Sequence, residues 1–150
     1  MIATHSGIRE ATAADVDALM GLCMRFASES VYADRLAAHE PSVRKTCEWL
    51  IGGAGVVFLA EKDDQPVGMM GLAVFPHFLS GQLYGAEVFW WCNPEARGYG
   101  LKLLRRGEQW VRDKGAAFMQ LTAPTDDIER LYARLGYARI ETVYSKDLLC

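Results

Sequence analysis

The sequence lacks any apolar run close to the ~20 residues that a membrane-spanning helix needs. Its first residues, MIATHSGIREAT, also lack the basic region and apolar stretch of a signal peptide. Basic residues are not in surplus: 16 Lys and Arg against 19 Asp and Glu give a net charge of −3. Nucleic-acid binders usually carry a basic surplus. Together these absences predict a soluble, cytoplasmic protein with no membrane or nucleic-acid partner.

Cysteine is also scarce, and the four cysteines include no CxxC pair. Metal sites and disulfide frameworks both need closer or patterned spacing, so we expect reduced thiols and no metal. Cys23, Cys47 and Cys92 lie in apolar patterns, which favours positions in the core. Cys150 ends the chain and is expected to be an exposed thiol.

Length and composition indicate one globular domain that spans residues 1–150. The chain is 51% hydrophobic and 23% charged, which is the balance of a folded protein and not of a disordered one. There is no internal repeat and no low-complexity stretch.

Apolar periodicity alternates along the chain between the patterns of strands and helices. We expect strands at 7–10, 56–60, 67–75, 83–92, 118–122 and 137–146, and helices at about 15–27, 41–51, 98–114 and 126–135. Polar residues 63–65 are expected to form the turn of a hairpin. The order β-α-α-β-β-β-α-β-α-β predicts an α/β (or α+β) domain, with helices on both faces of a mixed central sheet.

The most informative segment runs from Trp91 to Leu104, where a strand ends at a proline and a glycine-containing turn opens a long helix. Backbone N–H groups in such a turn have no intrahelical partner, and the helix dipole adds positive potential. Gly98 and Gly100 let the backbone approach a phosphate, while Arg97 and Lys102 add positive charge. This pattern predicts a site for a pyrophosphate. The other interpretation is an ordinary strand-to-helix turn whose glycines serve tight packing.

Other phosphate-binding loops fit this segment less well. The pattern GxxxxGK followed by Ser or Thr is absent, and so is GxGxxG, because Gly98-Tyr99-Gly100 is followed by Leu101, Lys102 and Leu103. The preceding strand is also not the first of a repeating βαβ series, as a dinucleotide-binding fold would require.

The segment resembles the acetyl-CoA motif of the GNAT superfamily of N-acetyltransferases, which reads Arg or Gln, two residues, Gly, one residue, then Gly or Ala. The matching residues are Arg97, Gly98, Tyr99, Gly100, Leu101 and Lys102. Lys102 stands where the family usually has Gly or Ala. The helix end from Leu131-Tyr132 to Gly136-Tyr137 is similar to the family's LYxxxGF signature. Both signatures come in the family's order, and the element order also matches, so the resemblance covers nearly the whole chain.

The resemblance implies a GNAT fold and transfer of an acetyl group from acetyl-CoA to a primary amine. The acceptor would be a small molecule or a protein, and the amine would attack directly in a ternary complex. The implied cofactor contacts are Trp91, Cys92, Asn93, Arg97, Gly98, Tyr99, Gly100, Leu101, Lys102 and Thr125. Thr125 stands where many members have Asn. Dimers are common among proteins of this resemblance, which leaves a homodimer open.

Tyr132 matches the position at which many members of this family have a tyrosine that protonates the departing thiolate. A free tyrosine has a pKa of about 10 and is therefore protonated at neutral pH, so it can donate. The other interpretation is a core residue, because Tyr132 shares an apolar helix face with Ile128 and Leu135.

Glu87 is the candidate general base. It is the only carboxylate between Asp64 and Glu95, and it lies within an aromatic strand. Period-2 alternation predicts that Glu87 shares a face with Phe89 and Trp91, where burial would raise its pKa. Several proteins of the family place a glutamate on this strand. The other interpretation is an exposed glutamate at a strand end.

Two other functions stay open. Lys102 and Thr125 depart from the family's pattern and are compatible with a non-catalytic module that binds CoA or a protein partner. A nucleic-acid-directed acyltransferase would use Lys102, Arg105, Arg106 and Arg112, although the net charge argues against it. The sequence does not identify the acceptor.

Overall fold

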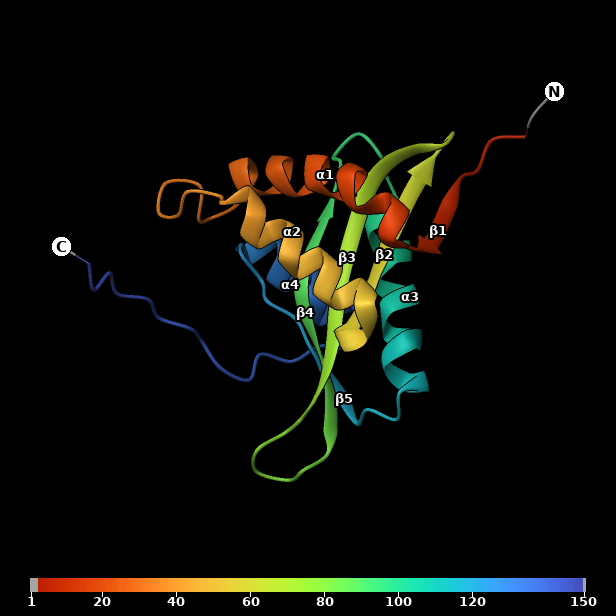
Figure 1. The fold of residues 1–150 in the computed structure, drawn as a ribbon. Coiled ribbons are helices and arrows are strands. Elements are labelled where there is room, and N and C mark those ends of the chain that lie inside the picture. The colour runs from red at the N-terminus through yellow and green to blue at the C-terminus, as the bar shows by residue number, and fades with distance from the viewer. Residues whose placement is uncertain (1–2, 150) are drawn as a thin grey trace.

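The computed structural model describes residues 3–149 and contains a five-stranded sheet in the order β1-β2-β3-β4-β5 (Figure 1). The pairs β1–β2, β2–β3 and β3–β4 are antiparallel, and β5 runs parallel to β4. The strands are β1 Gly7–Glu10, β2 Gly55–Lys62, β3 Gln65–Pro76, β4 Leu83–Cys92 and β5 Phe118–Gln120. The helices are α1 Val16–Glu29, α2 Glu40–Trp49, α3 Tyr99–Asp113 and α4 Asp126–Arg134, with a short 3-10 turn at Ala13–Asp15 and a π turn at Leu50–Ala54.

The predicted hairpin forms with a tight polar turn. Asp63 and Asp64 connect β2 to β3, and both have positive φ, at 51° and 63°. Turns with positive φ at both central residues match the right-handed twist of the paired strands, and Asp tolerates this conformation better than most residues. The hairpin thereby fixes the register of the two central strands.

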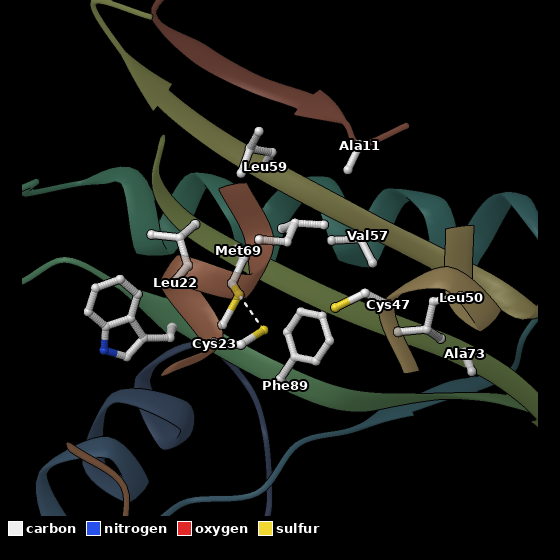
Figure 2. Close-up of a cluster of buried hydrophobic side chains, with 12 residues drawn as sticks. Ala11, Leu22, Cys23, Cys47, Leu50, Val57, Leu59, Met69, Ala73 and Phe89 are labelled. Carbon is white, nitrogen blue, oxygen red and sulfur yellow. Dashed lines mark hydrogen bonds between the residues drawn. The ribbon is translucent and has the colours of Figure 1, made fainter. Parts of the chain in front are cut away.

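Helices cover both faces of the sheet, as predicted. On one face α1 and α2 pack against the sheet, with Cys23, Leu50, Val57, Met69 and Phe89 among the buried residues (Figure 2). On the opposite face α3 packs over a second buried cluster, which consists of Val56, Phe58, Ala60, Met70, Leu72, Leu103, Leu104 and Val111. The strand pleat explains the division, because successive residues of β2 and β3 point to opposite faces.

The cysteines mostly follow expectation. Cys23 and Cys47 are buried and free, and the Cys23 thiol lies 3.5 Å from the Met69 sulfur. Cys92 is also free but only half-buried, at the end of β4. Cys150 lies outside the described residues.

A bulge in β4 overturns the predicted orientation of Glu87. Gly71 of β3 pairs with Phe89 and Leu72 pairs with Glu87, so Val88 is an extra residue in β4. An extra residue shifts the alternation of side chains by one position. Glu87 therefore lies on the α3 face of the sheet, opposite the face that Phe89 shares with Trp91.

Strand β5 is shorter than predicted, because it ends at Gln120 and not at Thr122. The backbone of Thr122 bonds to side chains instead of a neighbouring strand: its N–H donates to Glu87 and its C=O accepts from Tyr132. Pairing between β5 and β4 is consequently limited to Tyr84–Ala86 on the β4 side.

The predicted final strand at 137–146 is wrong. Residues 138–149 form no helix or strand and extend away from the body of the protein (Figure 1). The side chains of Ile140, Val143 and Tyr144 are 80%, 83% and 91% exposed. Alternation predicts which residues would share a face, but a strand forms only where another strand offers an edge for pairing.

No helix in residues 3–149 is long and apolar enough to cross a membrane. The same residues contain no group of three or more His, Cys, Asp or Glu side chains placed to hold a metal ion.

Candidate active site

The turn between β4 and α3 is shaped by its own backbone and by Asn93. The N–H of Ala96 donates to the Asn93 C=O at 2.9 Å, and the Asn93 side-chain oxygen accepts from the Glu95 N–H at 3.1 Å. Gly98 precedes the first residue of α3 with φ of +85°, in the left-handed region that favours glycine. The chain thus reverses sharply and begins a 15-residue helix.

The first turn of α3 presents free backbone donors. Its first helical hydrogen bond runs from the Lys102 N–H to the Gly98 C=O at 3.2 Å. Among residues 3–149, no carbonyl accepts from the N–H groups of Gly98 and Leu101. The Gly100 N–H faces the Cys92 sulfur, where it opposes the rise that burial causes in the pKa of that thiol. These donors lie at the positive end of the helix dipole, beside the exposed side chain of Arg97, and suit a phosphate or pyrophosphate.

Packing does not explain the glycine at position 100. A Cβ atom placed there would lie 3.6 Å from the Cβ of Cys92, which is ordinary van der Waals contact. By contrast, a Cβ at Gly85 would lie 2.5 Å from a methyl carbon of Val111. The open space at Gly100 therefore fits the close approach of an external group better than tight packing within the protein.

Lys102, the departure from the family's motif, is tied to the surface of α3. Its ammonium lies 5.0 Å from the ring centre of Tyr99, in the geometry of a cation–π contact. Two other basic residues of this helix also have partners within the chain: Arg106 lies over Phe58 and Arg112 lies 3.7 Å from Glu108. The free N–H groups of the turn are thus not covered by the lysine side chain.

The end of β4 has one open edge. The Asn93 N–H donates to the C=O of Val67 in β3 at 2.7 Å, so Asn93 and Val67 form a hydrogen-bonded pair of the antiparallel ladder. Because such pairs alternate in an antiparallel ladder, Trp91 also bonds to β3, and the Cys92 N–H points to the other side. Strand β5 does not reach this far, so the side of β4 beyond Ala86 is unpaired in the described chain.

Glu87 and Tyr132 meet at the backbone of Thr122. The Thr122 N–H donates to Glu87 Oε1 at 2.6 Å, and the Tyr132 hydroxyl donates to the Thr122 C=O at 2.9 Å. The Tyr132 ring is buried and stacks on Trp90, with ring centres 6.0 Å apart and planes 11° from parallel. Tyr132 also contacts Tyr137, with ring centres 5.9 Å apart.

Burial perturbs both of these groups. Loss of water raises the pKa of Glu87 to about 7, although the Thr122 N–H opposes the shift by stabilising the carboxylate. Burial also raises the pKa of Tyr132 above its usual value, and the nearby carboxylate of Glu87 adds to the effect. Near neutral pH the site therefore holds a carboxylate that can take up a proton and a hydroxyl that keeps its own.

Thr125, the remaining implied cofactor contact, caps α4. Its hydroxyl oxygen accepts from the Ile128 N–H at 3.4 Å, which satisfies one donor of the first helical turn. The structure thus gives Thr125 a structural task at the start of the helix that carries Tyr132.

Sequence reasoning missed Thr122 and did not link Trp90 to Tyr132. Thr122 acts through its backbone, so its side-chain type carries no signal. Trp90 is adjacent to Trp91 in an aromatic strand, and only the bulge shows that it shares a face with Glu87. The pairing of Trp90 with Tyr132 joins the two motifs on which the functional interpretation depends.

Comparisons with known proteins agree with this arrangement. The model of the acetyltransferase (GNAT) family matches residues 22–137. No curated protein sequence matches the chain significantly.

Solved structures share the fold at low sequence identity. A transcriptional regulator from Bacillus halodurans C-125 is 20% identical with a TM-score of 0.78, over 96% of this chain and 100% of that one. AAC(6')-Iy in complex with the bisubstrate analogue CoA-S-monomethyl-acetylneamine is 17% identical with a TM-score of 0.77, over 98% of this chain and 100% of that one. The aminoglycoside antibiotic 6'-N-acetyltransferase AAC(6')-IG from Acinetobacter haemolyticus is 20% identical with a TM-score of 0.70, over 95% of this chain and 99% of that one. With the family match over most of the chain, the free donors at the start of α3 and the Glu87–Thr122–Tyr132 arrangement belong to a member of the acetyltransferase (GNAT) family.

Proposed function

We propose that this protein transfers an acetyl group from acetyl-CoA to a primary amine. The observation that carries the proposal is the joint attachment of Glu87 and Tyr132 to Thr122, beside the unpaired edge of β4. In this proposal, a proton acceptor and a proton donor lie next to the part of β4 that β5 does not pair with. The free N–H groups of the α3 turn lie at the end of the same strand.

The residues present fit the cofactor at two points. The N–H groups of Gly98 and Leu101, with Arg97, would hold the pyrophosphate, since no carbonyl of the described protein accepts from these two groups and a glycine at position 100 leaves space beside them. The N–H of Cys92 on the open side of β4 would donate to an oxygen of the acyl-pantetheine chain. Acetyl-CoA supplies the electrophilic thioester carbon and the sulfur leaving group.

Glu87 acts as the general base in this proposal. With a pKa of about 7 it accepts a proton from the acceptor ammonium, directly or through water, which frees the nitrogen lone pair. The amine nitrogen then forms a bond to the thioester carbon while the carbon–sulfur bond breaks. Holding amine and thioester together in one site can itself supply ~7–11 kcal/mol of the barrier reduction.

Tyr132 completes the proton balance. Its raised pKa makes it a weak acid, so it does not ionise on its own. Instead, the Tyr132 hydroxyl gives its proton to the leaving sulfur. At the same time, the Tyr132 oxygen takes the proton that the nitrogen loses when the amide forms. The products are the acetylated amine and the free thiol.

Calorimetric titration with acetyl-CoA and a thiol-release assay with a panel of primary amines test this function. We expect saturable binding, weakened in Arg97→Ala and Gly98→Pro, and release of thiol that depends on an amine. Tight binding without turnover would instead identify a non-catalytic module. Absence of binding in the unmodified protein would show that the turn at Gly98 is structural.

A further inference from the structure

A hollow of about 330 Å³ lies on the α1 and α2 face of the sheet, over the bulge of β4. Its walls come from the end of α1, the loop that follows, α2 and β4. Phe26, Leu36, Val43, Val88 and Phe89 are among the lining residues. The volume lies within the range of small-molecule sites.

The hollow presents apolar surface and no charge. Its lining contains no Asp, Glu, Lys, Arg or His residue. Two of its hydroxyl groups already donate to backbone oxygens: Ser30 bonds to the Ala27 C=O at 3.0 Å and Thr46 bonds to the Ser42 C=O at 3.1 Å. The hollow has no negative side chain to pair with a polycationic ligand. An apolar group, by contrast, gains free energy when it leaves water for this surface.

The bulge connects this hollow with the candidate base. Val88 lines the hollow and follows Glu87 directly, yet the bulge places Glu87 on the opposite face of the sheet. Strand β5 is paired with β4 only as far as Ala86, so no strand separates the two sides beyond that point. An amine attached to a group in the hollow can therefore extend past the edge of β4 toward Glu87.

We propose that the acceptor is a primary amine with an uncharged aryl or branched alkyl body, and that this body occupies the hollow. The proposal rests on the proposed acetyl transfer and specifies the substrate class. It separates this chain from enzymes whose acceptors are aminoglycosides, because those acceptors carry several positive charges and many hydroxyl groups.

Steady-state thiol release with three acceptors tests the proposal: phenylethylamine, ethylamine and an aminoglycoside. Burial of the phenyl group predicts kcat/KM at least about tenfold higher for phenylethylamine than for ethylamine. Ala27→Phe, which fills the hollow, should raise KM for phenylethylamine about tenfold and change KM for ethylamine much less. Ala18→Phe, at an exposed position of α1 that does not line the hollow, is the matched control and should change neither.

Equal kcat/KM for phenylethylamine and ethylamine, or preference for the aminoglycoside, would overturn the apolar-acceptor proposal while leaving acetyl transfer intact. If no amine is acetylated, the proposed function fails, and the hollow is tested by titration with N-acetyl-phenylethylamine followed by NMR. Shifts of the Val88 and Phe89 amides that Ala27→Phe abolishes would support the site. Unchanged amides would overturn it.

Discussion

Glu87 and Tyr132 are 45 positions apart in the sequence and are fixed by the same residue: Glu87 accepts from the Thr122 N–H, and Tyr132 donates to the Thr122 C=O. Neither contact involves the threonine side chain. The site is therefore tolerant of substitution at Thr122 but sensitive to displacement of its backbone. Four predictions follow from this geometry and from the turn at α3.

Glu87→Gln should lower kcat/KM by about 10²-fold, the usual contribution of a positioned general base. In the unmodified protein, kcat/KM should rise with pH up to about 7, because the carboxylate must be ionised to accept a proton. The variant should lack this limb of the pH profile. Glu48→Gln, an exposed carboxylate of α2, is the control, and a Glu87→Gln profile identical to that of the control would exclude Glu87 as the base.

The same substitution should change how stability depends on pH. Burial raises the pKa of Glu87 from 4.5 to about 7, so between these values the folded protein binds a proton that the unfolded chain releases. The stability contributed by the protonated form is thus present at low pH and is lost as the pH rises toward 7. Glu87→Gln removes this loss, so its melting temperature relative to the unmodified protein should increase across that window. Melting curves at several pH values measure the difference, and a constant difference would contradict the raised pKa.

Tyr132→Phe should lower kcat and leave the Kd for acetyl-CoA unchanged, since the ring remains stacked on Trp90. It should also cost ~0.5–1.5 kcal/mol of stability, because the hydrogen bond to the Thr122 C=O is lost. Denaturant unfolding and calorimetry separate the two effects. Tyr144→Phe, at an exposed position in the segment after α4, should alter none of these quantities. Full activity in Tyr132→Phe would assign Tyr132 to the core alone.

Gly100→Ala should separate cofactor binding from stability. The added methyl group fits the protein and favours a helix, so stability should stay constant or rise by up to ~1 kcal/mol. The methyl group would, however, enter the space next to the free N–H groups, and the Kd for acetyl-CoA should increase about tenfold, or ~1.4 kcal/mol. Gly85→Ala is the converse control: contact with Val111 should destabilise it by ~1–3 kcal/mol with little change in Kd. An unchanged Kd in Gly100→Ala would place the pyrophosphate elsewhere.

Features that depend on local patterns could be predicted from the sequence. Helical periodicity and the turn residues predicted α3 and α4 to within a few residues, and the run from Leu83 to Cys92 predicted β4 with its observed bounds. Positive φ at Asp63, Asp64 and Gly98 occurs at residue types that tolerate it, so these turns were also predictable. Each of these features depends on residues only a few positions apart.

Features that depend on residues far apart in the sequence could not be predicted in this way. The bulge at Val88 arises from the pairing of β4 with β3, and it moved Glu87 to the face opposite Phe89. The strand predicted at 137–146 did not form, because alternation specifies a face and not a pairing edge. The backbone of Thr122 became the centre of the candidate site through two side chains from other elements. Strand register and side-chain contacts to the backbone are long-range, so a local pattern does not encode them.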